Sequence, residues 1–252
     1  MIDIHSHLLP AVDDGSPTVE VSVEVLERFS RDGVELVVCT PHLNASDAHE
    51  VGVDCNEDLL ENLRRHAPLR PQLASGWEIM LDKPGVDLRP LHLHLAGSTA
   101  VLVEFPRTQV PDGAAKELYR LRMCGVVPVL AHPERYWGCT SGLVRSWREA
   151  GAVIQMDAAM VLGSEPASRL SKTLLQEGLV DCIASDNHGD VRSLAAARTW
   201  LLEIGATEQA NMLTSVNARR LLADEPVLPV SPIPVIEKGA VARLKELLLG
   251  RR

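Results

Sequence analysis

Four segments of the chain share one pattern, in which a glycine precedes an apolar run rich in β-branched residues and a polar side chain ends the run. Glycine is suited to ending a preceding helix, because it adopts the left-handed conformation at no steric cost. A nearly continuous apolar strand is typical of a parallel sheet that is buried on both faces. The pattern therefore predicts repeated βα units, at residues 33–42, 125–132, 151–157 and 178–186.

Two further apolar runs, at residues 73–79 and 98–105, fit the same scheme. Parallel strands joined by helices close into a barrel or form an open sheet, and in a barrel the chemistry gathers at the carboxyl ends of the strands. Amphipathic segments between the runs predict the helices, near residues 18–32, 54–66, 112–124, 140–150, 165–177 and 190–204.

The chain length predicts one domain over residues 1–252. With 252 residues, 46% of them hydrophobic, the chain can form one large core, and an α/β barrel of this size is ordinary. Four prolines within residues 226–234 exclude a helix there, so we expect an extended, proline-rich strap at about 226–234. A C-terminal helix is expected at about 237–249.

Charge and cysteine content exclude several classes of function. The formal net charge is −9 and there is no basic stripe, which argues against a nucleic-acid partner. Neither a basic segment nor a long apolar stretch follows Met1, so we expect no membrane insertion, no secretory signal and a cytoplasmic location. The five cysteines include no C-x-x-C pair and suit a reducing compartment.

Histidines and carboxylates stand where the apolar runs give way to turns. His5 and His7 are two residues apart in a strand-like run, so their side chains point to the same face and can hold one ion. Imidazole and carboxylate together bind divalent cations and leave positions open for water and substrate. The H-x-H pair of His92 and His94 follows no apolar strand, and we interpret it as structural, together with His49 and His66.

Six ordered motifs over residues 1 to about 220 resemble the PHP (polymerase and histidinol phosphatase) superfamily. Two of them, Asp13-Asp14-Gly15 and the run from Ala131 to Tyr136, resemble its branch of bacterial capsule and exopolysaccharide tyrosine-protein phosphatases. The six motifs are Ile2-Asp3-Ile4-His5-Ser6-His7 with Asp13-Asp14-Gly15, Thr40-Pro41-His42, Gly76-Trp77-Glu78-Ile79, Val103-Glu104, Ala131-His132-Pro133-Glu134-Arg135-Tyr136 and Ser185-Asp186-Asn187-His188.

This resemblance implies a distorted TIM-like (β/α)7 barrel, the PHP fold, with three divalent metal ions at the carboxyl ends of the strands. The family is often manganese-filled, and mixed histidine and carboxylate sites also accept iron, zinc or magnesium. The implied ligands are His5, His7 and Asp186 for one ion, with Glu78 bridging to a second that Glu104 and His132 also hold, and Asp14, His42 and His188 for the third.

The implied activity is hydrolysis of phosphotyrosine by a metal-activated hydroxide, on a protein substrate such as a bacterial tyrosine kinase that controls capsule or exopolysaccharide synthesis. Besides the bridging Glu78, the catalytic candidates are Arg135 and Arg192, because arginine offers phosphate bidentate hydrogen bonds. Arg192 follows Asp190 in the expected first turn of a helix, where a positive charge is disfavoured, and a salt bridge to Asp190 is the equal alternative. An aromatic pocket would depend on Tyr136, Trp137 or aliphatic walls, and Trp137 fits core or rim equally well.

Three alternatives stay open. Cys139, Gly142 and Arg145 fit the C-x-x-G-x-x-R-S pattern of cysteine-dependent tyrosine phosphatases, in which a thiolate attacks phosphorus. A small phosphate ester such as histidinol phosphate would need the same metals, and a non-catalytic metal-binding interaction module would need no turnover. Asp13 and Asp157 lie outside the implied ligand set, and we expect them to have structural or supporting roles.

Overall fold

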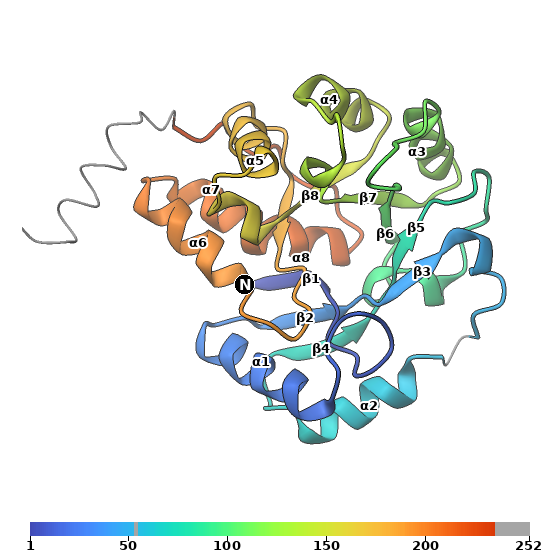
Figure 1. Ribbon diagram of the computed structural model, residues 1–252, viewed down its shortest axis with the longest axis vertical. Helices are drawn as coiled ribbons and strands as arrows, with labels where there is room; N and C mark the ends of the chain where they lie inside the picture. Colours follow the sequence, from blue (N-terminus) through green and yellow to red (C-terminus); the bar gives the residue numbers. More distant parts are fainter. Residues whose placement is uncertain (53–54, 235–252) are drawn as a thin grey trace, which may run out of the picture.

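The computed structural model of the protein covers residues 1–52 and 55–234 (Figure 1). In this part of the chain nine strands form two sheets, and every pair of neighbouring strands is parallel. The predicted α/β class with parallel strands is thereby confirmed. The strands are β1 (Ile2–Ser6), β2 (Leu36–Cys39), β3 (His42–Asn44), β4 (Gln72–Ser75), β5 (Glu78–Met80), β6 (Ala100–Glu104), β7 (Val127–Ala131), β8 (Val153–Asp157) and β9 (Cys182–Ala184).

Helices surround the strands (Figure 1). All six predicted helices are present, although α2 and α6 begin later than the predicted residues 54 and 190. No helix among the described residues combines the length and apolarity needed to cross a membrane. The α-helices are α1 (Val19–Arg31), α2 (Glu57–His66), α3 (Ala114–Met123), α4 (Ser141–Glu149), α5 (Pro166–Gln176), α6 (Leu194–Glu203), α7 (Thr207–Asn211) and α8 (Asn217–Leu222).

A helical segment at residues 207–222 was not predicted. It consists of α7, a π-helical turn η6 (Met212–Val216) and α8 in direct succession. The other short helices are 3-10 turns that connect strands to the segments after them. They are η1 (Ala45–Asp47), η2 (Leu91–Leu93), η3 (Leu95–Gly97), η4 (Pro133–Arg135) and η5 (Ala158–Val161).

The two sheets have the orders β1-β2-β4 and β3-β5-β6-β7-β8-β9. The predicted strand at 33–42 is divided into β2 and β3, and the predicted strand at 73–79 is divided into β4 and β5. A single parallel bridge between Ser6 and Asn187 links β1 to the segment after β9. Among the described residues the hydrogen-bonded ladders form no closed sheet, so the expected barrel is not confirmed.

Alternate residues of the strands belong to two different apolar clusters. In β6, Ala100 and Leu102 belong to an inner cluster, whereas Val101 and Val103 pack with residues of the surrounding helices. Residues of β1, β2, β7, β8 and β9 also enter the inner cluster, which therefore draws on both sheets. Glu104 lies two positions after Leu102, so the inner face becomes polar at the carboxyl end of the strand.

Residues 226–234 contain no helix or strand. The side-chain amide of Asn217 joins this segment to α8 by accepting a hydrogen bond from the Leu228 backbone N–H and donating one to the Leu228 carbonyl, both at 2.9 Å. Val230 and Ile233 are buried in the apolar cluster that lies between the strands and the surrounding helices. The helix expected at about 237–249 lies outside the described residues.

Replacing Trp147 by alanine should lower the free energy of unfolding by about 3–5 kcal/mol, because a large aromatic side chain leaves a cavity in a packed core. Trp147 is 2% exposed, and its ring centroid lies 6.1 Å from that of Tyr136 and 6.4 Å from that of Phe105. Urea denaturation followed by circular dichroism measures the loss. Trp137→Ala is the matched control: Trp137 is 81% exposed, and its replacement should cost less than about 0.5 kcal/mol. Equal losses for the two variants would contradict the core assignment.

Candidate metal centre

All nine predicted metal-binding residues come together, most of them at or after the carboxyl ends of strands. Their donor atoms form four overlapping groups, and within each group these atoms lie within 4.8 Å of one another. His5 belongs to β1, His42 and Glu78 begin β3 and β5, and Glu104 ends β6. The other five lie in segments that follow strands, namely His7, Asp14, His132, Asp186 and His188.

The first group combines His5, His7 and Asp186, all of which are buried. The Nε2 atoms of the two histidines are 3.2 Å apart. Oδ1 of Asp186 lies 3.3 Å from Nε2 of His5 and 3.4 Å from Nε2 of His7. The H-x-H spacing in β1 therefore points both rings at one carboxylate, and the group has the composition that the sequence implied for the first ion.

Glu78 connects the groups to one another. Its Oε2 atom lies 3.0 Å from Nδ1 of His42, 3.2 Å from Nε2 of His7 and 3.3 Å from Nε2 of His5. Its other oxygen, Oε1, accepts a hydrogen bond of 2.7 Å from Nε2 of His132. A single buried carboxylate thus faces histidines from the ends of three strands, as a bridging ligand would.

Glu104 lies beside this carboxylate at the end of β6. Its Oε1 atom is 3.7 Å from Nδ1 of His42, and its Oε2 atom is 3.9 Å from Nε2 of His132. Glu104 therefore shares a group with His42 and Glu78 as well as lying near His132.

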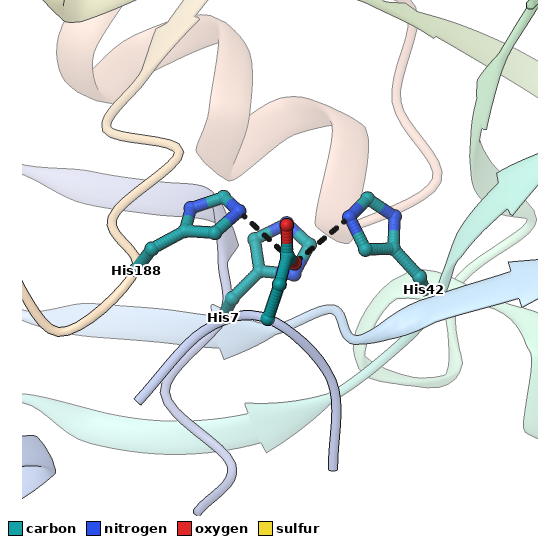
Figure 2. Close-up of side chains that lie close together, drawn as sticks. His7, His42 and His188 are labelled. Carbon is teal, nitrogen blue, oxygen red and sulfur yellow. Dashed lines mark ion pairs between the residues drawn. The ribbon is translucent and has the colours of Figure 1, made fainter. Parts of the chain in front are cut away.

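The last group consists of His7, Asp14, His42 and His188. Figure 2 shows the three histidine rings turned toward one another from separate segments of the chain. Oδ1 of Asp14 lies 3.4 Å from Nε2 of His42 and 3.5 Å from Nε2 of His188. The sequence assigned His7 to the first ion alone, whereas the geometry places it in both groups.

Three histidines are held by hydrogen bonds from their Nδ1 atoms, which leaves Nε2 facing the centre. Nδ1 of His5 donates to Oε1 of Gln155 at 3.1 Å, and Nδ1 of His7 donates to Oδ2 of Asp13 at 2.7 Å. Nδ1 of His188 donates to the carbonyl oxygen of Asp186 at 2.9 Å. Such bonds select the tautomer and orientation that a metal-binding imidazole needs.

Gln155 was missed by the sequence reasoning, and Asp13 was assigned only a structural or supporting role. Asp13 has a supporting role in two places, since its Oδ2 atom also accepts a hydrogen bond of 3.1 Å from the backbone N–H of His42. The signal for Gln155 was a lone amide within the apolar run at residues 151–157. That signal is weak, because only the folded strand shows which face the amide occupies.

Unusual backbone conformations place several of these groups. His132 and Asp186 have φ angles of +31° and +47°, in the left-handed region that side chains disfavour. Gly15 closes the turn that carries Asp13 and Asp14, and a Cβ atom at this position would lie 2.3 Å from the carbonyl oxygen of His7. Any other residue at position 15 would therefore displace the ligand-bearing turn.

The ionisable groups of the centre strongly perturb one another. Burial disfavours the charged form of His5, but the negative charges of Glu78 and Asp186 raise its pKa to about 9. Burial and then the charge of Glu78 raise the pKa of Glu104 to about 7. Burial would also raise the pKa of Glu78, but the positive charge of His5 and hydrogen bonds from neighbouring histidines hold it well below its usual value. Cations that bind here must displace protons.

These donors fit divalent metal ions. Donor atoms on one ion, each at about 2.0–2.2 Å from it, stand roughly 3 Å apart or slightly more. The distances from Oε2 of Glu78 to His5, His7 and His42 are 3.3, 3.2 and 3.0 Å, yet this buried oxygen accepts no hydrogen bond of good geometry from the described residues. Buried carboxylates without such bonds are costly unless a cation neutralises them. The donor set therefore matches metal binding better than a hydrogen-bonded network.

Both candidate arginines lie at the edge of the first group. Nη1 of Arg135 contacts Oδ2 of Asp186, and Nη1 of Arg192 lies 3.3 Å from the same oxygen. Nε of Arg192 also donates to Oδ2 of Asp190 at 2.8 Å, which is the salt bridge that the sequence offered as the alternative to phosphate binding. The helix-dipole argument for Arg192 was wrong, because α6 begins only at Leu194 and Arg192 precedes it.

The histidines that the sequence set aside belong to no metal group of the described residues. Both ring nitrogens of His94 bond to backbone carbonyl groups, of Ser98 at 2.7 Å and of Leu88 at 2.8 Å. His66 bonds to the carbonyl oxygen of Asn62 in its own helix at 2.9 Å. Neither residue has a free nitrogen directed at another ligand.

The Cys139 alternative finds no support in the geometry. Burial raises the pKa of the Cys139 thiol to about 12, so the nucleophilic thiolate is disfavoured. Thr140 caps α4, and its carbonyl oxygen faces the thiol at 3.8 Å. Nη2 of Arg145 donates to Glu177 on α5 at 3.0 Å and does not turn back toward the thiol. The loop therefore lacks the arginine that the cysteine mechanism needs.

Replacing Gln155 by leucine should weaken binding of manganese by about 10–100-fold, because Nδ1 of His5 loses the acceptor that orients the ring. Calorimetric titration of the metal-free protein measures this. Nε2 of Gln155 has no partner among the described residues, so leucine also removes an unpaired buried amide, and folding should be retained. Gln209→Leu is the matched control, since Gln209 is buried but bonds to the carbonyl oxygens of Ser231 and Pro232. Unchanged affinity in the Gln155 variant would refute the orienting role.

Cys139→Ser should leave the rate of phosphate release from a phosphotyrosine peptide within about twofold of the unmodified protein, because a thiol with a raised pKa is a poor nucleophile. The measurement is steady-state turnover with metal present. A loss of several orders of magnitude would restore the cysteine mechanism.

Known proteins resemble this chain over most of its length. Residues 1–223 match the family described as capsular polysaccharide synthesis, CpsB/CapC. The chain is 30% identical to tyrosine-protein phosphatase YwqE of Bacillus subtilis (strain 168) over 251 residues, covering 93% of this chain and 96% of that protein. It is also 30% identical to tyrosine-protein phosphatase CpsB of Streptococcus agalactiae serotype III (strain NEM316) over 241 residues, covering 88% of this chain and 98% of that protein.

A solved structure shows the same similarity in three dimensions. It comes from work on YwqE from Bacillus subtilis and CpsB from Streptococcus pneumoniae, described as unique metal-dependent tyrosine phosphatases. The TM-score is 0.77 at 28% identity, and the match covers 94% of this chain and all of the other.

Proposed function

Because this chain belongs to the CpsB/CapC family of capsular polysaccharide synthesis, we propose that it is a metal-dependent tyrosine-protein phosphatase. The observation that carries the proposal is the convergence of nine histidine and carboxylate side chains with two arginines at their edge. Such a site binds divalent ions and a phosphate ester together.

We assign three divalent ions to the centre, with manganese as the first choice and iron, zinc and magnesium as alternatives. When bound, the ions supply Lewis-acid activation of water and neutralise charge on the phosphoryl group. The number three is the one that the resemblance implies, and the overlapping donor groups contain all nine of the ligands proposed for these ions. The proposed ligands are His5, His7 and Asp186 for one ion, Glu78, Glu104 and His132 for a second that Glu78 bridges to the first, and Asp14, His42 and His188 for the third.

Arg135 and Arg192 would bind the phosphoryl oxygens. Both guanidinium groups contact Asp186, and both side chains are 20% exposed, so they are anchored to the site while remaining accessible. Asp157 lies 3.6 Å from Nη1 of Arg135, and Asp190 holds Nε of Arg192. Each arginine is thus oriented by a second carboxylate and keeps part of its planar group for phosphate.

Departure of the tyrosine phenolate as the leaving group requires little proton donation from the protein. A phenolate has a conjugate-acid pKa of about 10, so it leaves more readily than an alkoxide without full protonation. The nearby hydroxyl group of Tyr136 donates to the carbonyl oxygen of Ala131 at 2.8 Å, and burial raises its pKa well above the usual value. Tyr136 therefore serves as a structural group, and we assign no general acid.

We further propose that the described residues form one domain with a distorted seven-stranded barrel, the PHP fold. In this arrangement β2 and β3 are two parts of one barrel strand, and β4 and β5 are two parts of another. Support comes from the inner cluster, which draws on both sheets, and from the bridge between Ser6 and Asn187, which joins the first strand to the last.

The proposed substrate is phosphotyrosine in a protein, with a bacterial tyrosine kinase that controls capsule or exopolysaccharide synthesis as the first candidate. We propose the cytoplasm as the location, because all five cysteines are free thiols, two of them on exposed residues.

Protein stripped with a chelator should release no phosphate from a phosphotyrosine peptide, and added manganese should restore turnover, because the chain's own side chains provide no nucleophile of comparable reactivity. His5→Ala should lower the restored rate by at least about 100-fold. His66→Ala is the matched control, since His66 lies outside every metal group and should keep full activity.

Two results would contradict the proposal. Turnover that survives complete removal of metal would exclude the metal mechanism. Metal-dependent release of phosphate from a small ester such as histidinol phosphate, with none from phosphotyrosine peptides, would keep the metal centre and refute the tyrosine-phosphatase assignment.

A further inference from the structure

Trp137 is exposed to an unusual degree for so large an apolar side chain. It is 81% exposed, whereas Trp147 and Trp77 are 2% and 7% exposed. Trp137 is two residues from Arg135, at the end of the segment that carries the phosphate-binding candidate. An exposed side chain contributes little to the core, and this one directly follows the segment that carries His132 and Arg135, so we considered a role in binding.

Hydrogen bonds fix the backbone that presents this tryptophan. The Trp137 backbone N–H donates to the carbonyl oxygen of Arg107 at 2.8 Å. In the preceding residue, the hydroxyl oxygen of Tyr136 accepts a bond of 3.1 Å from the Phe105 backbone N–H. The Tyr136 ring packs edge-on to His132, with centroids 6.2 Å apart. Hydrogen bonds therefore fix the backbone that carries Trp137, and the preceding Tyr136 contacts His132, one of the proposed metal ligands.

Arg107, the residue bonded to Trp137, lines a hollow beside the metal centre. The hollow has a volume of about 380 Å³, and its wall includes Asp14, His42 and Glu104, three of the proposed ligands. Arg107 is exposed, and no carboxylate within residues 1–52 and 55–234 lies within 4 Å of its guanidinium group. Arg135 and Arg192, by contrast, both contact Asp186. Arg107 thus places an exposed positive charge at the mouth of the site, in the hollow that Glu104 also lines.

We propose that Arg107 and Trp137 form a docking edge for the polypeptide on either side of the phosphotyrosine. In this edge Arg107 pairs with an acidic residue next to the phosphotyrosine, and Trp137 packs against an adjacent apolar or backbone group. The inference rests on the proposed function and names its substrate class, an acidic phosphotyrosine segment. Charge complementarity favours this occupant, because Arg107 is exposed and positively charged beside the metal centre, where a carboxylate next to the phosphotyrosine could pair with it.

The test compares three substrates under manganese-saturated conditions: a phosphotyrosine peptide flanked by glutamates, the same peptide flanked by glutamines, and p-nitrophenyl phosphate. Arg107→Ala should raise KM for the glutamate peptide about fivefold and change it less for the glutamine peptide, as expected for a partly exposed ion pair. Arg107→Lys should restore most of the difference. Arg107→Glu should reverse the preference, so that KM for the glutamine peptide is lower than KM for the glutamate peptide.

Trp137→Ala should raise KM about three- to tenfold for both peptides and less for p-nitrophenyl phosphate, which is too small to reach the docking edge. Two exposed residues of α3 provide matched controls, Arg122→Ala for the charge and Tyr119→Ala for the aromatic ring. Both should leave all three substrates unchanged. Equal unfolding midpoints for all variants show that any loss arises from binding.

Some outcomes would overturn the docking edge while leaving the enzyme assignment intact. The first is that the unmodified protein has equal KM values for the glutamate peptide and the glutamine peptide. Another is an equal fall in kcat on all three substrates for Arg107→Ala, because Arg107 would then act on the phosphoryl group itself. Failure of the proposed function looks different: the unmodified protein would hydrolyse p-nitrophenyl phosphate and neither peptide, which would also remove the docking edge.

Discussion

The buried negative charge of Glu78 is the interaction on which the rest of the site depends. A carboxylate in an apolar interior costs several kcal/mol unless it is paired, on the order of 3–5 kcal/mol when one partner is removed. Here the pairing groups are His5, His7, His42 and His132, which come from the ends of β1, β3 and β7. The strand ends must therefore align to within a few tenths of an ångström for one oxygen to face three rings. Packing of the inner cluster below the site holds the strands in that alignment.

Much of the fold could be predicted from the sequence, because glycine and apolar runs report local structure directly. The division of two predicted strands could not, since it depends on how the sheets curve around the inner cluster. Proline at position 41, which lacks a backbone N–H, was a partial signal for the break between β2 and β3. The start of α6 was misplaced because Asp190 and Ser193 are both good helix-capping residues, and the structure uses Ser193.

The residues of the site could be predicted from the resemblance in motifs. Their geometry could be described only from the structure. No sequence pattern shows that His7 faces two groups of donors, because that depends on the approach of His188 from the segment after β9. The supporting role of Gln155 depends on which face of β8 it occupies. The backbone of Trp137 is bonded to that of Arg107, which lies 30 residues earlier in the chain. Spacing in the sequence alone could not show that these two residues are neighbours. The features that could not be predicted thus depend on contacts between segments that are distant in the sequence.

The junction between β1 and the segment after β9 has a consequence for how the protein is made. The backbone N–H of Ser185 donates to Asp3 across a separation of 182 residues, and the N–H of Asp186 donates to the carbonyl oxygen of His5. During synthesis from the N-terminus, β1 can pair with β2 early, but its junction with the segment after β9 forms only once that distant segment has been made. Contacts this distant in sequence form late and slowly. The metal centre is therefore completed late in folding, when Asp186 and His188 reach the side chains of His5 and His7.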